Sequence, residues 1–181
     1  METISSSELE ALVQKAQSGD LPNQELLIRH YQNRMAGFVY SFLGRPDLVE
    51  DLCQDIFIKI LLGLPRMKNP AQFESWLFRI ARNRCLDEIR KQKWRKIFIP
   101  WLSEYEELPA PPASRASKKI ESLLQAIQTL PPSQRELIAL IQDGDRSYEE
   151  LAAMTSSTVS SVKSRLFRAR EQLKEKLRDE S

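Results

Sequence analysis

The chain has 181 residues, of which 41% are hydrophobic and 29% charged, and its formal net charge is +2. This composition supports a folded core and excludes an intrinsically disordered chain. No apolar run is long enough to span a membrane, and the acidic start is unlike a signal peptide, so we expect a cytoplasmic protein without membrane insertion. His30 is the only histidine, and Cys53 and Cys85 stand far apart. We therefore expect no metal site, no enzyme activity, no cofactor and no small-molecule substrate.

The first half of the chain has the periodicity of four helices. Ser7 and Glu10 form a capping box at the start of the first, and Gly44 ends the second. Two prolines predict a loop at 63–70, because proline denies a helix its backbone donors. The four helices are expected at about 7–18, 24–43, 47–62 and 72–93.

The helical period fails between about 97 and 116, where four prolines mix with acidic residues, and this predicts an extended linker. Capping boxes then start helices at Ser133 and Ser147, and Asp143-Gly144-Asp145 ends the first of these. No segment alternates like a strand. The fold class is therefore all-α, with two helical domains joined by an acidic, proline-containing linker. The predicted bounds are 1–96, 97–116 and 117–181, and the second-domain helices lie at about 117–129, 133–142, 147–154 and 158–177.

Charges of one sign gather in separate segments. Residues 47–55 and 103–112 contain acids and no base, whereas 79–96 contains eight bases against two acids and 163–178 seven against two. Two basic segments indicate two contacts with a polyanion such as nucleic acid. The same charges fit two solvated amphipathic helices equally well, so charge alone leaves both interpretations open.

The last two predicted helices form a helix-turn-helix. A short helix, a brief turn and a longer basic helix suit insertion into a major groove. An apolar stripe on the longer helix faces inward and leaves hydroxyl and guanidinium groups on the opposite side, where they can reach phosphates and base edges. These groups belong to Ser161, Ser164, Arg165 and Arg168. A surface-charged helical hairpin is the alternative.

Two further clusters lie on the predicted third and fourth helices. Trp76, Arg79 and Asn83 share one face of the fourth, where an aromatic ring beside basic and amide groups suits unstacked bases. Trp76 fits a hydrophobic core equally well. On the third helix a polar patch indicates a docking surface for a basic protein, or else a solvated face. Its residues are Asp51, Gln54 and Asp55.

In this order, the segments resemble the extracytoplasmic-function class of bacterial RNA polymerase sigma factors. The resemblance spans roughly residues 8–178, and its specificity comes from the joint occurrence of four motifs. They are EDLCQDIF (50–57), FESWLFRIARNRCLDEIRK (73–91), LPPSQRE (130–136) and SYEELAAM with VKSRLFRARE (147–171).

The resemblance implies that the first domain melts and reads the minus-ten promoter element. The patch formed by Asp51, Gln54 and Asp55 would then dock on the clamp coiled coil of the polymerase β′ subunit. The loop before the fourth helix would hold a flipped base. Its pocket would comprise Lys68, Asn69, Trp76, Arg79 and Asn83.

The resemblance also implies that the second domain binds the minus-thirty-five element as duplex. The recognition helix would contribute Ser161, Lys163, Ser164, Arg165 and Arg168. The acidic linker, with Glu104, Glu106 and Glu107, would enter the polymerase cleft that later holds RNA. The expected partners are core polymerase through its β′ and β subunits, promoter DNA and an anti-sigma factor.

One motif departs from the family pattern. Sigma factors of this class usually have an apolar residue, glycine and another apolar residue at the turn before the recognition helix, and here Thr155, Ser156 and Ser157 take those places. A serine with positive φ costs about 1 kcal/mol relative to glycine. The second helix then begins with Thr158 as its N-cap.

Three functions remain in view. The chain is a dissociable initiation subunit, an autonomous helix-turn-helix regulator with a sensory first half, or an interaction protein that keeps the architecture without initiating transcription. The acidic patch around Asp51 and the Trp76–Asn83 face favour the first, since a sensor needs neither.

Overall fold

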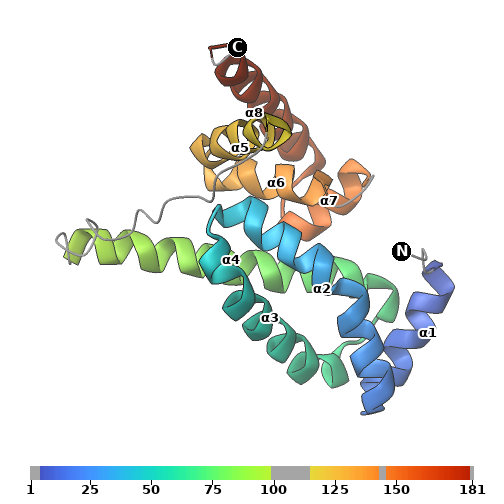
Figure 1. Ribbon diagram of the computed structural model, residues 1–181. Helices are drawn as coiled ribbons and strands as arrows, with labels where there is room; N and C mark the ends of the chain where they lie inside the picture. Colours follow the sequence, from blue (N-terminus) through green and yellow to red (C-terminus); the bar gives the residue numbers. More distant parts are fainter. Residues whose placement is uncertain (1–4, 99–114, 143–145, 180–181) are drawn as a thin grey trace.

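The computed structural model describes residues 5–98, 115–142 and 146–179. All regular structure in these ranges is helical, which confirms the predicted all-α class (Figure 1). Three short 3-10 turns join the helices of the first half, η1 (Pro46–Leu48), η2 (Leu64–Arg66) and η3 (Pro70–Gln72). The α-helices are α1 (Ser6–Gln17), α2 (Leu21–Leu43), α3 (Val49–Gly63), α4 (Phe73–Phe98), α5 (Arg115–Thr129), α6 (Pro132–Gln142), α7 (Tyr148–Thr155) and α8 (Val159–Asp179).

The first capping box lies two residues earlier than predicted. Ser5, rather than Ser7, is the N-cap of α1: its hydroxyl accepts from the Glu8 amide at 3.3 Å, and the Glu8 carboxylate accepts from the Ser5 amide at 2.8 Å. The prediction was wrong because the local sequence offers a Ser-x-x-Glu spacing in two registers. In α2, Pro22 occupies the first turn, where no intrahelical donor is required, so the helix starts at Leu21.

The start of α6 also differs from the prediction. The Pro131 carbonyl accepts from the amides of Gln134 at 2.9 Å and Arg135 at 3.0 Å, so Ser133 lies inside the helix instead of capping it. Glu136, expected to complete that cap, is buried and pairs with arginines elsewhere. By contrast, the box between Ser147 and Glu150 at the start of α7 is present as predicted.

Helical structure extends into both ends of the predicted linker. Helix α4 continues to Phe98, and α5 starts at Arg115. The rest of the predicted linker, with its three glutamates, lies outside the described residues, as does the predicted helix stop at 143–145.

The turn of the helix-turn-helix is polar and internally hydrogen-bonded. Ser156 has φ 51°, the left-handed conformation expected of this position. The buried Thr155 hydroxyl donates to the Leu151 carbonyl at 2.7 Å and shares a second hydrogen bond with Ser157 at 2.7 Å. The Thr158 hydroxyl accepts from the Ser161 amide at 3.2 Å, as predicted for an N-cap.

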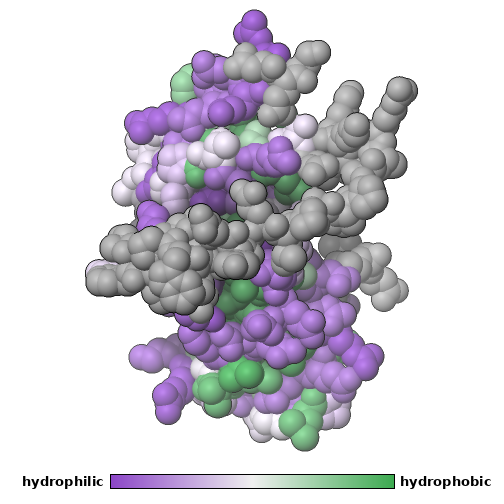
Figure 2. Space-filling view, turned by 60° about the vertical axis from the view of Figure 1, so that its left-hand side comes forward, coloured by the Kyte–Doolittle hydropathy of each residue, from purple (hydrophilic) through white to green (hydrophobic). Residues whose placement is uncertain are grey.

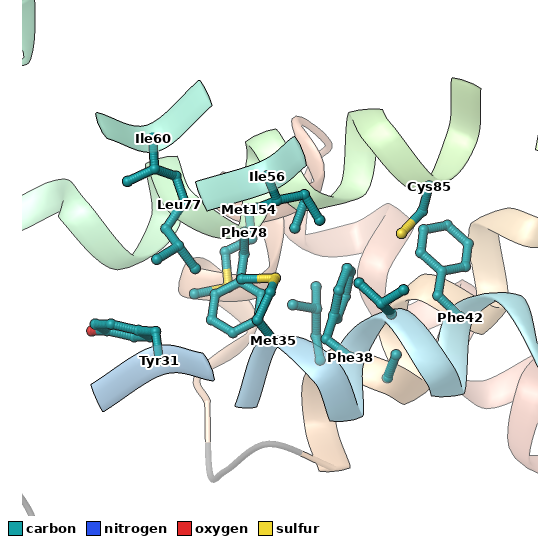
Figure 3. Close-up of a cluster of buried hydrophobic side chains, with 14 of the residues drawn as sticks. Tyr31, Met35, Phe38, Phe42, Ile56, Ile60, Leu77, Phe78, Cys85 and Met154 are labelled. Carbon is teal, nitrogen blue, oxygen red and sulfur yellow. The ribbon is translucent and has the colours of Figure 1, made fainter. Parts of the chain in front are cut away.

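Both halves of the described chain contribute to one continuous core. Aromatic residues of α2, including Phe38 and Phe42, pack against Ile56 of α3 and Phe78 of α4 (Figure 3). Met154 of α7 belongs to the same cluster, so the second half is packed against the first. Helices α5, α6 and α7 accordingly lie along α2 and α4 (Figure 1).

Replacing Ser156 with glycine is expected to raise the free energy of unfolding by about 1 kcal/mol, because glycine adopts positive φ without a Cβ clash. Urea unfolding monitored by circular dichroism measures the change. Ser160→Gly is the matched control: this exposed residue lies in the first turn of α8, where glycine should lower stability by about 0.5 kcal/mol. Equal effects of the two substitutions would contradict the assigned strain.

Candidate nucleic-acid interface

A pocket of about 460 Å³ lies between the segment from η2 to η3 and the first turns of α4. Four of the residues predicted to contact a flipped base line it: Lys68, Asn69, Trp76 and Arg79. The fifth, Asn83, is exposed one turn further along α4, where it accepts from Arg82 at 3.4 Å and does not line the pocket. Arg66 and Met67, from the loop predicted to hold the base, also line it. The remaining lining residues, which the sequence did not single out, are Gln72, Ser75 and Ala153.

The pocket wall is held in place by a side chain from another helix. The Gln17 amide of α1 donates to the carbonyls of Leu64 at 3.1 Å and Met67 at 2.8 Å. The Asn69 side chain accepts from the Ala71 amide at 3.1 Å and so starts η3. No local signal marks Gln17 for this role, since its partners lie about fifty residues away.

Trp76 combines the two roles that the sequence left open. It is half-buried, with its ring centroid 6.0 Å from that of the buried Phe73. Its indole also lies against Gly63, where an added Cβ would come within 2.8 Å of the ring. The remaining edge borders the pocket. The packing against Phe73 and Gly63 fixes the orientation of a ring available for stacking.

The described pocket lining is basic. Arg66, Lys68 and Arg79 are exposed, and no lining residue carries a carboxylate. Asn69, Gln72 and Ser75 add amide and hydroxyl groups that can donate to or accept from a base edge. This combination of a ring, cations and neutral polar groups suits a single-stranded nucleotide.

The three residues of the predicted docking patch on α3 differ in their surroundings. Asp51 and Gln54 are exposed, whereas the Asp55 carboxylate accepts from Arg84 of α4 at 2.8 and 3.0 Å. Two exposed apolar residues, Ile58 and Leu62, continue the face at helical spacing. Among the coloured atoms of Figure 2, hydrophilic surface predominates, with hydrophobic patches toward the lower end of the view.

The recognition helix α8 presents its predicted residues in two groups. Lys163, Ser164 and Arg168 are exposed. Arg165 is half-buried: it donates to the Ser161 hydroxyl at 2.7 and 3.0 Å, and its Nη1 lies 3.5 Å from Glu136. Phe167, which the sequence reasoning passed over, is 68% exposed on the same helix.

Burial suppresses the acidity of both cysteine thiols. Burial raises the pKa of Cys53 to about 11 and raises that of Cys85 further, so both thiols stay protonated at neutral pH. Within the described ranges no three His, Cys, Asp or Glu side chains are grouped to hold a metal ion. In the same ranges no helix combines the length and apolarity needed to cross a bilayer.

Comparisons with known proteins cover both halves. Family models for Sigma-70 region 2 and Sigma-70 region 4 match residues 27–95 and 120–173. The chain is 30% identical over 179 residues to an ECF RNA polymerase sigma-E factor of Haemophilus influenzae, covering 93% of this chain and 94% of that protein.

Two solved structures share the fold. One is CnrH in complex with the cytosolic domain of CnrY, with 26% identity, a TM-score of 0.74, and coverage of 96% of this chain and 99% of that one. The other is the sigma factor RpoE of Bartonella quintana in complex with the anti-sigma factor NepR. It has 28% identity, a TM-score of 0.71, and coverage of 85% and 96%.

Gly63→Ala is expected to lower the free energy of unfolding by about 1–3 kcal/mol, because the new methyl group displaces the Trp76 ring. Gly37→Ala is the control: it lies in the middle of α2 with no atom near the added Cβ, and should raise stability by about 1 kcal/mol. Urea unfolding and tryptophan emission report both effects. Stabilisation by both substitutions would show that Gly63 does not position the indole.

Proposed function

Because the chain belongs to the extracytoplasmic-function class of bacterial RNA polymerase sigma factors, we propose a specific division of labour among its surfaces. The α3 face docks on core polymerase, the pocket beside α4 takes a base of the melted minus-ten element, and α8 binds the minus-thirty-five duplex. The chain acts in the cytoplasm as a non-catalytic subunit. The observation that carries this proposal is the pocket, which gathers four of the five residues singled out for the minus-ten element.

The pocket supports capture of a single flipped base. Its volume falls within the range of pockets that bind small ligands. Removing a base from the stack costs a few kcal/mol, which stacking on Trp76 and hydrogen bonds to Asn69 can offset. Lys68 and Arg79 lie at the same pocket, where they can neutralise the phosphates on either side of the base.

For the upstream element, the exposed Lys163, Ser164 and Arg168 are the groups of α8 that can reach a major groove directly. Ser161 and Arg165 are bonded to each other and must exchange that contact for one with DNA. The lysine and arginine contacts to phosphate make binding salt-dependent.

For polymerase, Asp51 and Gln54 supply the exposed groups of the docking face, and Asp55 acts by fixing α3 to α4 through Arg84. We assign this face to the β′ clamp coiled coil and contacts of the second half to the β subunit. The Asp55–Arg84 pair links the docking face to the helix that carries the pocket. Polymerase binding therefore positions the pocket as well as the chain.

We also propose control by an anti-sigma factor. The RpoE neighbour from Bartonella quintana was solved with one, and its fold covers 85% of this chain. An autonomous helix-turn-helix regulator is not favoured, because the Sigma-70 region 2 match at 27–95 accounts for a first half that such a regulator would not need.

The docking assignment is tested by Asp51→Lys combined with Gln54→Ala. We expect binding to purified core polymerase to fall at least tenfold, because a polar contact is lost and a charge is reversed at an exposed face. Glu25→Lys, an equivalent reversal on α2, is the control and should bind like wild type. Co-migration in size-exclusion chromatography measures association, and wild-type binding by the double variant would exclude this face.

The pocket assignment is tested by Trp76→Ala in the reconstituted holoenzyme. Loss of one stacked base costs about 1–3 kcal/mol, so open-complex formation should fall about five- to 150-fold while polymerase association is kept. Permanganate reactivity of thymines in the minus-ten element measures opening. Trp94→Ala, an exposed tryptophan farther along α4, should open the promoter normally. Equal opening by the two variants, at a temperature where circular dichroism shows that both are folded, would contradict the assignment.

A further inference from the structure

Helix α1 lies beside the loop that carries the pocket wall, although it precedes the segment that matches Sigma-70 region 2 (Figure 1). Gln17 is the last residue of this helix, and its side-chain amide donates to the carbonyls of Leu64 at 3.1 Å and Met67 at 2.8 Å. The Met67 amide donates to the same Leu64 carbonyl at 3.1 Å, which closes the η2 turn. A single side chain from another helix therefore holds both ends of this turn.

The backbone that carries Gln17 is itself fixed. Leu12, Val13 and Ala16 of the same helix are buried in the core of the first half. The Ala16 carbonyl also accepts from the Gln24 side chain of α2 at 3.0 Å. The end of α1 is thus attached to α2, and the Gln17 amide acts on the η2 turn from an immobile base.

Residues that would contact the base follow the η2 turn directly. Lys68 and Asn69 come after Met67, and all three line the pocket. Residues 67–69 belong to no helix, so hydrogen bonds from their surroundings set the path of the backbone. Gln17 anchors this stretch at its upstream end, and the Asn69 side chain, which accepts from the Ala71 amide, anchors it at its downstream end.

Such anchoring matters for binding because a wall that is already ordered loses little conformational entropy when the base enters. Gln17 does not line the pocket, so any effect on the base passes through the loop. It also lies outside the apolar core that joins α2, α3 and α4. Its amide should therefore influence the shape of the pocket wall more than the stability of the whole fold.

We propose that Gln17 is a positioning residue of the base pocket, and that its amide holds the η2 turn in the base-accepting conformation before DNA binds. This inference rests on the proposed function of the pocket. It extends the functional unit for the minus-ten element beyond the segment that matches Sigma-70 region 2, back to the end of α1.

A double-mutant cycle between Gln17 and the flipped base tests the proposal in the reconstituted holoenzyme. Gln17→Met keeps the length of the side chain without a donor, and Gln17→Glu places a carboxylate against the two carbonyls. Each protein binds single-stranded minus-ten oligonucleotides in which an abasic site is scanned along the element, and fluorescence anisotropy gives the affinities. The flipped position is the one where wild type loses most affinity, about tenfold.

We expect Gln17→Met to bind the intact oligonucleotide about tenfold more weakly than wild type, because two hydrogen bonds to the wall are lost. At the flipped position the abasic site should then cost this variant less than about twofold, so that the two proteins bind the abasic oligonucleotide equally. Gln17→Glu should show the same pattern with a larger loss, since its carboxylate repels both carbonyls.

Gln24→Met is the matched control, because it also removes a hydrogen bond from a side-chain amide to a backbone carbonyl at the end of α1 but leaves the η2 turn untouched. It should bind every oligonucleotide like wild type. Hydrogen exchange in the free chain gives a second readout without DNA. Gln17→Met should accelerate exchange of the Met67 amide about tenfold, and Gln24→Met should leave it unchanged.

A wild-type loss at the flipped position that persists in Gln17→Met would overturn the positioning role and leave the proposed function standing. Equal weakening by Gln17→Met and Gln24→Met, or unchanged exchange of Met67 in Gln17→Met, would also overturn it. If wild type itself binds the intact and all abasic oligonucleotides equally, the pocket captures no base, and the proposed function fails together with this inference.

Discussion

Helix α4 contacts both halves of the molecule through the ring of Phe78. It packs edge-on against Phe38 of α2 with centroids 5.4 Å apart, and the Arg146 guanidinium lies over it from the second half. Arg34 of α2 approaches the same ring at 5.7 Å. Because Phe78 of α4 is fully buried, the helix that carries the pocket cannot shift without disturbing the core of the first half and the contacts with the second.

The helices could be predicted from the sequence because apolar residues recur at helical spacing. The predicted start of a helix was wrong where the local sequence allowed more than one N-cap. The region around Ser5 and Ser7 contains two capping registers, and local pattern alone does not choose between them. At α6 the Ser-x-x-Glu spacing was present, yet Glu136 serves a buried ion pair instead of a cap. Here the tertiary partner Arg82, 54 residues away, decides the role of the residue.

Some residues of the candidate site could likewise be predicted from local sequence, and others only from the fold. Lys68, Asn69, Trp76 and Arg79 are close in sequence, so a loop and one helix face were enough to group them. Gln17 holds the pocket wall and Ala153 lines the pocket, both from distant segments, and no local pattern marks them. Similarly, the sequence placed Asp55 on a polar face with Asp51 and Gln54, but its ion pair with Arg84 depends on how α3 packs on α4.

The polar turn before α8 shows how a departure from a family pattern can be accommodated. Thr155 and Ser157 supply hydrogen bonds where the family pattern leads us to expect apolar contacts, and Ser156 adopts the left-handed conformation despite its Cβ. The geometry of the helix-turn-helix is therefore kept with different chemistry. The strain falls on one residue, and the N-cap at Thr158 starts the recognition helix directly after it.

Helix α1 has a consequence for anyone who works with part of this protein. It precedes the segment that matches Sigma-70 region 2, yet its Gln17 fastens two backbone carbonyls beneath the pocket. A fragment trimmed to residues 27–95 would retain the segment that matches Sigma-70 region 2 but would lose the Gln17 hydrogen bonds that hold the pocket wall. Weak DNA binding by such a fragment would then reflect a loop that is no longer held in place, and not the wrong DNA sequence.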